Sequence, residues 1–219
     1  MRYRRPQNYI EKLEHYKKQN IIVQDIKPGE PIFSNNQDIY LEIGMGRGAF
    51  VTQHAQRYPG NNYIGIEKQA PLLISASQKI EEMGLENIKL MSFDARSLEE
   101  VFGENTVAGI YLNFSDPWSK PRYAKRRLTH SLMLQKYAAL MKDQSKLIIK
   151  TDNKDLFEFT VQQIESSKFD IIHMESSLYG SGDDLNQKDD PKYIQTEYES
   201  KFIDQGKAIF YLECKLNKV

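Results

Sequence analysis

Cysteine is almost absent from the sequence. The only one among 219 residues, Cys214, cannot form an internal disulfide, and no group of cysteines and histidines has the spacing of a zinc site. Glycine accounts for 12 residues and proline for 8, too few for a collagen-like or low-complexity chain. We therefore expect a globular protein with no metal ion.

Long apolar runs are missing as well. No stretch approaches the roughly 18 residues that a membrane-spanning helix needs. The opening segment, MRYRRPQNYIEKLEHYKK, lacks the apolar centre of a signal peptide. These two absences predict a cytoplasmic protein that does not engage a membrane.

Neither sign of charge is in excess, but the charges are unevenly placed. Basic and acidic residues number 30 each, so the formal net charge is zero. Segment 1–18 carries six basic and two acidic side chains, whereas 183–190 is acidic. Segment 120–130 contains no acid and five cations, which are Lys120, Arg122, Lys125, Arg126 and Arg127. The two basic patches are typical of a surface that meets a polyanion such as nucleic acid.

Short β-rich runs alternate with helical patterns along the chain. Connections of about 10 to 30 residues between the first five runs are typical of a parallel sheet with helices on both faces. Segment 208–216 has a period-two pattern, which predicts an antiparallel strand in the edge region of the sheet. The seven strands expected are 39–44, 62–67, 88–93, 109–115, 146–151, 169–174 and 208–216. We expect one α/β domain over 1–219, with 1–30 as a basic N-terminal extension.

Two further segments carry local signals. Pro121 suits the first turn of a helix reaching to about Lys142, because apolar residues recur there at steps of three and four, namely Met133, Tyr137, Leu140 and Met141. Segment 179–191 lacks periodicity and is rich in glycine, aspartate and asparagine, so it is predicted to be a long loop.

Closely spaced glycines follow the first strand. Gly44, Gly46 and Gly48 lie between a predicted strand and helix, where glycines let the backbone approach a ligand. The pattern matches a dinucleotide fingerprint, with Glu67 placed to bind ribose hydroxyls. It also matches E-x-G-x-G-x-G, in which Glu42 favours a cationic ligand such as S-adenosylmethionine (AdoMet) over a pyrophosphate. A tight turn without a ligand is the structural alternative.

The third and fourth strands also end in acidic residues. Asp94, followed by Ala95, could accept from an adenine amino group or could cap the next helix. Asp116 stands beside the only tryptophan, Trp118, and ahead of the five cations, which together suit a nucleobase and its phosphates. A solvated helix face and a tryptophan packed in the core are the alternatives for this segment.

These motifs together resemble a known family over nearly the whole chain. They are Glu42-Ile43-Gly44-x-Gly46-x-Gly48-x-Phe50, Gly65-Ile66-Glu67, Asp94-Ala95-Arg96, Phe114-Ser115-Asp116-Pro117-Trp118, Arg126-Arg127-Leu128, Lys150-Thr151-Asp152 and Thr196-Glu197-Tyr198-Glu199-x-Lys201-Phe202. The sequence is similar to the bacterial tRNA (guanine-N7-)-methyltransferases. The resemblance implies a Rossmann-like class I methyltransferase fold, AdoMet as the methyl donor and tRNA as the partner, methylated at N7 of guanine-46 in the variable loop.

The resemblance also implies roles for individual residues. Those expected to bind AdoMet or line its pocket are Glu42, Gly44, Gly46, Gly48, Glu67, Asp94, Ala95 and Asp116. Those expected to bind the substrate are Lys120, Asp152, Thr196, Glu197, Tyr198 and Glu199. Arg122, Lys125, Arg126 and Arg127 match the stretch that contacts RNA. The protein is expected to act as a monomer or homodimer.

Two of these residues have structural alternatives. Asp152 follows a strand and precedes a helical pattern, an arrangement that is typical of an N-cap. Glu199 could lie on the wet side of a helix, with Tyr198 and Phe202 packing inward at i and i+4.

The chemistry expected needs no general base. Guanine N7 has an in-plane lone pair and no proton to lose, so holding it in line with the methyl group is the main requirement. Asp116 is the catalytic candidate, since an acceptor for the guanine N1–H and amine would bind more strongly as the base becomes cationic. A methyltransferase for another substrate, a non-catalytic RNA-binding protein and a nicotinamide dehydrogenase are the alternatives.

Overall fold

The computed structural model describes residues 7–179 and 190–218. Its contacts divide the chain into two compact units, Met1–Phe102 and Gly103–Val219, called unit 1 and unit 2 below. Three arginines of the predicted N-terminal patch and three aspartates of the acidic segment lie outside the described residues: Arg2, Arg4, Arg5, Asp183, Asp184 and Asp189. The single domain over 1–219 stays a prediction.

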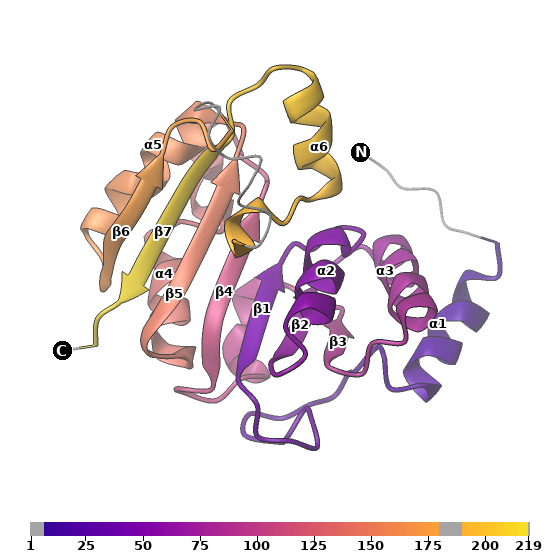
Figure 1. The fold of residues 1–219 in the computed structure, drawn as a ribbon. Coiled ribbons are helices and arrows are strands. Elements are labelled where there is room, and N and C mark those ends of the chain that lie inside the picture. Colours follow the sequence, from indigo (N-terminus) through magenta and orange to yellow (C-terminus); the bar gives the residue numbers. More distant parts are fainter. Residues whose placement is uncertain (1–6, 180–189, 219) are drawn as a thin grey trace. The chain divides into compact units, whose positions relative to one another are not determined.

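Unit 1 contains three parallel strands in the order β3-β2-β1 (Figure 1). They are β1 (Ile39–Ile43), β2 (Asn62–Ile66) and β3 (Ile88–Met91). Every residue of the central strand β2 is buried, as expected for a parallel strand with both faces covered. Helix α2 (Ala49–Arg57) connects β1 to β2, and α3 (Ala70–Met83) connects β2 to β3.

Part of the predicted N-terminal extension is packed into unit 1. Helix α1 (Tyr9–Lys18) lies against α3, and its Tyr16 is only 6% exposed. Beyond it, Ile22 forms a β-bridge with Leu90 of β3, and Val23 donates its backbone N–H to the Leu90 carbonyl at 2.9 Å. Segment 9–23 therefore contributes to the core of this unit.

Unit 2 contains four strands in the order β4-β5-β7-β6. They are β4 (Val107–Asn113), β5 (Met141–Thr151), β6 (Phe169–Glu175) and β7 (Phe210–Leu216). β4 is parallel to β5, whereas β7 is antiparallel to both β5 and β6. The predicted seven-stranded, mostly parallel sheet with an antiparallel edge region is confirmed. Strand β7, however, lies between β5 and β6, so the outermost strand is β6.

The helices of unit 2 differ from the expectation at one place. The predicted helix from Pro121 to about Lys142 is wrong: a short 3-10 helix η2 (Pro121–Arg126) is followed by an extended segment and then α4 (Ser131–Leu140). Met141, expected in the helix, begins β5. The predicted stripe is nevertheless buried, with exposures of 4% or less at Met133, Tyr137, Leu140 and Met141.

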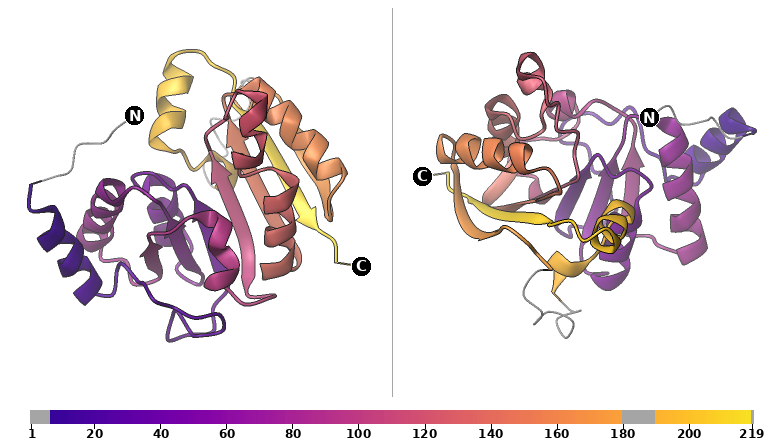
Figure 2. Two further views of the ribbon diagram at one scale, coloured as in Figure 1. Left: turned by 180° about the vertical axis from the view of Figure 1, so that it is seen from behind. Right: turned by 90° about the horizontal axis from the view of Figure 1, so that it is seen from above.

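The remaining helices of unit 2 lie on a face of its strands or at their carboxyl ends. Helix α5 (Lys154–Glu165) lies beside α4 against these strands, as the view from behind shows (Figure 2). Helix α6 (Glu197–Asp204) lies beyond the carboxyl ends of β4 and β5 (Figure 1). Within the described ranges, no helix is long and apolar enough to cross a membrane.

Candidate functional site

The glycine turn of unit 1 is tied to the end of β2. The backbone N–H groups of Gly44 and Met45 both donate to the Ile66 carbonyl, at 2.8 and 3.2 Å. The Gly46 N–H donates to the Glu67 carboxylate at 3.2 Å. These bonds hold the turn at the carboxyl edge of the strands, where ligands bind in α/β sheets.

The three glycines of this turn have different surroundings. All have positive φ, at 79°, 58° and 75° for Gly44, Gly46 and Gly48. A Cβ added at Gly44 or Gly46 would meet no atom within 4 Å, so a ligand has room to approach their backbone. A Cβ at Gly48 would lie 2.8 Å from Cβ of Ala76 on α3. Gly48 therefore allows close packing of α2 on α3.

Glu42 and Glu67 are anchored by backbone donors. Glu42 is 2% exposed and accepts from the Val51 N–H at 3.1 Å, in the first turn of α2. Glu67 accepts from Gly46 with one oxygen and from the Gln69 N–H at 2.9 Å with the other. These two bonds hold the Glu67 carboxylate at the end of β2, beside the glycine turn.

Asp94 is the N-cap of the 3-10 helix η1 (Ala95–Glu100). Its carboxylate accepts from the Arg96 N–H at 3.0 Å, and it forms ion pairs with the side chains of Arg96 and Lys68, both at 2.5 Å. The Arg96 guanidinium, aided by Lys68, holds the pKa of Asp94 well below its usual range. Ala95 beside it is buried. The capping alternative is thus confirmed, and the ionised carboxylate remains a hydrogen-bond acceptor.

In unit 2, Asp116 lies in an exposed loop with unusual backbone geometry. Phe114 and Trp118, on either side of it, have φ of 51° and 42°, which non-glycine residues rarely adopt. Such strain persists only where surrounding contacts impose it, and it is frequent at functional sites. The loop begins where the Phe114 N–H donates to the Lys150 carbonyl at 2.8 Å.

Arg127 holds the other end of this loop. Its guanidinium donates to the carbonyls of Pro117 at 2.9 Å and Trp118 at 3.4 Å, and it lies 4.2 Å from the ring centre of Phe159. The side chain is directed inward, and the residue is only 9% exposed. The expectation that Arg127 contacts RNA is therefore corrected: its donors serve the main chain of the Asp116 loop.

The other cations of this segment are exposed. Arg126 lies 4.9 Å from the ring centre of Trp118 and 4.6 Å from that of Tyr123, and Arg122 lies 4.8 Å from the Tyr123 ring. The two rings meet edge to face at 5.9 Å. Lys120, Arg122, Lys125 and Arg126 are exposed on or beside η2. Exposed cations next to aromatic rings suit phosphates and stacked bases.

Asp152 is not the helix cap that its position suggests. The N-cap of α5 is Asn153, whose side chain accepts from the Leu156 N–H at 2.8 Å. The Asp152 carboxylate instead pairs with Lys207 at 3.4 Å and is 26% exposed. Lys207 in turn lies 4.3 Å from the ring centre of Phe202 on α6. The capping alternative is thus wrong, and Asp152 presents its carboxylate at the end of β5.

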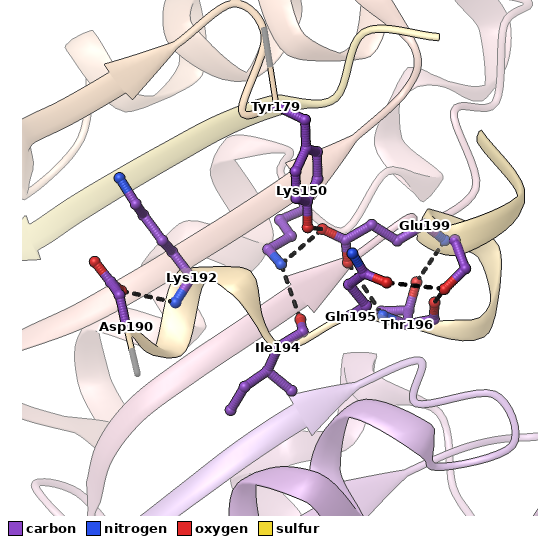
Figure 3. A network of polar contacts seen from close by, with 9 residues as sticks. Lys150, Tyr179, Asp190, Lys192, Ile194, Gln195, Thr196 and Glu199 are labelled. Atoms are coloured by element: carbon purple, nitrogen blue, oxygen red, sulfur yellow. Dashed lines mark hydrogen bonds and ion pairs between the residues drawn. The ribbon is translucent and has the colours of Figure 1, made fainter. Parts of the chain in front are cut away.

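Glu199 lies in a buried polar network (Figure 3). One carboxylate oxygen accepts from Lys150 Nζ at 2.9 Å and from the Tyr179 hydroxyl at 2.7 Å. Lys150 Nζ also donates to the Ile194 carbonyl at 3.0 Å. The side chains of Lys150 and Glu199 have no exposed surface. Burial and the neighbouring Glu199 raise the pKa of Tyr179, which therefore stays protonated and donates.

The other oxygen of Glu199 completes the start of α6. It accepts from the Thr196 N–H at 3.1 Å, while the Thr196 hydroxyl accepts from the Glu199 N–H at 3.0 Å, which makes a capping box. Tyr198 is 47% exposed. The alternative with Glu199 in water and Tyr198 packed inward is therefore wrong, because the ion pair with Lys150 draws Glu199 inside.

Sequence reasoning assigned no role to Lys150, Tyr179 or Lys207. Lys150 carried a signal, since a lysine in the predicted apolar strand 146–151 needs a buried partner. Tyr179 and Lys207 carried none, because their partners are distant in sequence. Among the described residues, no group of three or more histidine, cysteine, aspartate or glutamate side chains could hold a metal ion.

Comparisons with known proteins agree on a methyltransferase. Residues 36–212 match the family model Methyltransf_4, described as putative methyltransferase. Solved structures with a similar fold include the 16S rRNA methyltransferase KamB, with 11% identity and a TM-score of 0.61 over 82% of this chain and 88% of that one. A SAM-dependent methyltransferase from Aquifex aeolicus has 13% identity and a TM-score of 0.55 over 97% and 94%.

Curated relatives are much closer in sequence. A tRNA (guanine-N(7)-)-methyltransferase of Alkaliphilus oremlandii is 41% identical, covering 96% of this chain and 97% of the relative. Proteins of the same name from Staphylococcus saprophyticus and Alkaliphilus metalliredigens are 40% and 42% identical, covering 84% and 81% of this chain and 84% and 82% of those proteins. The chain belongs to the family of tRNA (guanine-N7-)-methyltransferases.

Proposed function

We propose that this protein transfers the methyl group of AdoMet to N7 of a guanine in tRNA, in the cytoplasm. The observation that carries the proposal is the 41% identity, over 96% of the chain, with a protein of that name. The family resemblance favours guanine-46 of the variable loop as the target.

The residues of unit 1 fit AdoMet. The open backbone at Gly44 and Gly46 can admit the ligand, and Glu67 places a carboxylate, the group that accepts from ribose hydroxyls, against the Gly46 N–H. The ionised Asp94 can accept from the adenine amine. Glu42 fixes the first turn of α2 at the end of the glycine turn. When bound, AdoMet supplies an electrophilic methyl group attached to a sulfonium.

The residues of unit 2 fit a guanine in RNA. Exposed cations on and beside η2 are suited to phosphates, and we assign the tRNA contacts to Lys120, Arg122, Lys125 and Arg126. Asp152 and the start of α6, with Thr196, Glu197 and the exposed Tyr198, offer polar and aromatic groups for the base.

The chain's task in the reaction is positioning and charge stabilisation. Guanine N7 needs no deprotonation, so orientation of the base supplies most of the acceleration. Asp116 is exposed in its constrained loop and can accept from the guanine N1–H and exocyclic amine. These hydrogen bonds strengthen as methylation makes the base cationic, so they favour the transition state.

The test is methyl transfer to a defined RNA. The protein is incubated with an unmodified tRNA transcript and labelled AdoMet, and the product is analysed by nucleoside mass spectrometry and by strand scission at 7-methylguanine. We expect one 7-methylguanine, absent from a transcript with adenine at position 46. Label in another nucleoside, or no label, would contradict the proposal.

Two controls separate the rival activities. Free guanosine should be a far poorer substrate than tRNA; equal efficiency would indicate a small-molecule methyltransferase. Calorimetric titration should show that the protein binds AdoMet and does not bind NAD. Tight binding of NAD would favour a dehydrogenase.

A further inference from the structure

Lys150 is at the centre of several contacts that come from distant segments of unit 2. It lies on β5, its side chain reaches Glu199 on α6 and the carbonyl of Ile194, and its own carbonyl accepts the N–H of Phe114 at the start of the Asp116 loop. Asp152 follows two residues later in the chain. One buried residue thus contacts both segments to which we assign the guanine.

The energetics of such a pair favour a role in geometry over one in stability. Removing a lysine and a carboxylate from water is costly, and a buried ion pair is frequently no more stable than apolar side chains of similar size. What the pair supplies is a defined arrangement, since Glu199 accepts only if Lys150, Tyr179 and the Thr196 N–H all lie in place. Glu199 itself has no exposed surface for a substrate.

The segment held by this network carries exposed groups. Tyr198 directly precedes Glu199 in the chain. Its ring stacks on that of Phe202, with 6.5 Å between the two ring centres and 29° between the two ring planes. Phe202 contacts Phe114, 5.6 Å between ring centres. A shift of Glu199 would therefore displace Tyr198 and disturb the aromatic contact next to the Asp116 loop.

We propose that Lys150 is a positioning residue for the tRNA guanine: through Glu199 it fixes the start of α6, and thereby orients Thr196 and Tyr198 toward the base. Lys150 and Tyr179 hold the Glu199 carboxylate in place through their hydrogen bonds. Glu199 in turn positions the start of α6 and does not contact the substrate. The proposal rests on the function proposed above.

The test variant replaces both charges at once, as Lys150→Met with Glu199→Gln. Glutamine can still form the capping box, and no lone charge remains buried. We expect a thermal midpoint within about 5 °C of the wild type and an AdoMet Kd within about threefold. The kcat/KM for tRNA should fall at least about 30-fold. Amide hydrogen exchange in 196–204 should accelerate at least about tenfold relative to α5.

A matched control changes the same residue types on the surface. Lys154 and Glu158 form an exposed pair on α5, so Lys154→Met with Glu158→Gln should leave all four measurements unchanged. Tyr179→Phe removes one donor to Glu199 and keeps both charges. Its kcat/KM for tRNA and its amide hydrogen exchange in 196–204 should both lie between those of the wild type and those of the double variant.

The outcomes separate the two proposals. A double variant that methylates tRNA within about threefold of wild type, with unchanged exchange in 196–204, overturns the role of Lys150. If the double variant does not fold, Tyr179→Phe decides by the same two measurements. If the wild type does not methylate tRNA at guanine N7, the proposed function fails, and the exchange measurement alone tests whether the network fixes α6.

Discussion

At the scale of single residues, Asp116 is the side chain on which the proposed chemistry depends most. It is exposed, so Asp116→Asn should change the free energy of unfolding by no more than about 0.5 kcal/mol. Loss of a charge-assisted hydrogen bond of about 1.5–3 kcal/mol should lower single-turnover methyl transfer roughly 10- to 150-fold. Rapid-quench kinetics with the enzyme in excess over tRNA, at saturating AdoMet, measures this step.

The control for Asp116 is another exposed aspartate of unit 2. Asp170→Asn on β6 should leave methyl transfer at the wild-type rate. Normal turnover together with normal AdoMet affinity in Asp116→Asn would show that Asp116 contacts neither ligand.

Arg127 offers a second prediction at this scale. Lysine keeps the charge but cannot donate to two carbonyls in one plane or stack on Phe159, so Arg127→Lys should cost about 1–2 kcal/mol of unfolding free energy. Methyl transfer should fall several-fold more than tRNA affinity, because the Asp116 loop loses its anchor. Denaturant unfolding and filter binding measure the two effects.

Arg126→Lys is the matched control. Arg126 is exposed and directed at Trp118 and Tyr123, so its replacement should change stability by less than about 0.5 kcal/mol. Equal destabilisation by the two substitutions would refute the assignment of Arg127 to the loop.

The sequence predicted the types of site residue better than their environments. Asp94 and Asp152 each had two readings from local spacing, and the structure supports the cap for Asp94 and excludes it for Asp152. Spacing alone cannot separate them, because the neighbouring Asn153 competes for the same helix start. The burial of Glu199 was missed, since it depends on Lys150, which lies 49 residues away in sequence.

At the scale of elements, the glycine turn between β1 and α2 separates ligand binding from packing. Gly48→Ala forces a methyl group to within 2.8 Å of Ala76 at a φ of 75°, so it should destabilise the fold by about 1–3 kcal/mol. Gly46→Ala meets open space and should cost about 1 kcal/mol from its positive φ, but the methyl group would occupy room needed by AdoMet. Its AdoMet affinity should fall at least about tenfold.

Unfolding without AdoMet and calorimetric titration with AdoMet measure these two effects separately. If Gly46→Ala binds AdoMet normally, the space above Gly46 is not part of the ligand site.

All seven strands were predictable from their β-rich runs and turns, to within two residues at the ends except for β5, which begins five residues before the predicted start. The long helix 121–142 was not, because the backbone is extended at Arg127, whose side chain donates to the carbonyls of Pro117 and Trp118, far from any local helical signal. The place of β7 inside the sheet was also missed. Its alternating sequence predicted a strand with one buried face, as in an edge strand. Tyr211 on the opposite face is buried as well, packed with Leu178 and Ile209.

At the scale of the whole molecule, a net charge of zero means that attraction to tRNA depends on where the cations are placed. The exposed cations of η2 are unopposed by acids in their segment, so each should neutralise about one phosphate. Changing Arg122, Lys125 and Arg126 to glutamine should make the slope of log Kobs against log salt less steep by about 2 to 3. Arg127 is not included in this variant because it is buried and its replacement would disturb the Asp116 loop.

Fluorescence titration of tRNA at several salt concentrations gives this slope, and the same loss of charge elsewhere provides the control. Changing Lys142, Lys146 and Lys154, which are exposed on β5 and α5, to glutamine lowers the net charge equally. If both triple variants shift the slope by the same amount, binding responds to overall charge and the η2 cations are not a contact surface. A shift confined to the η2 variant, with AdoMet affinity unchanged, places the tRNA backbone against these residues, because only bound phosphates release their counterions.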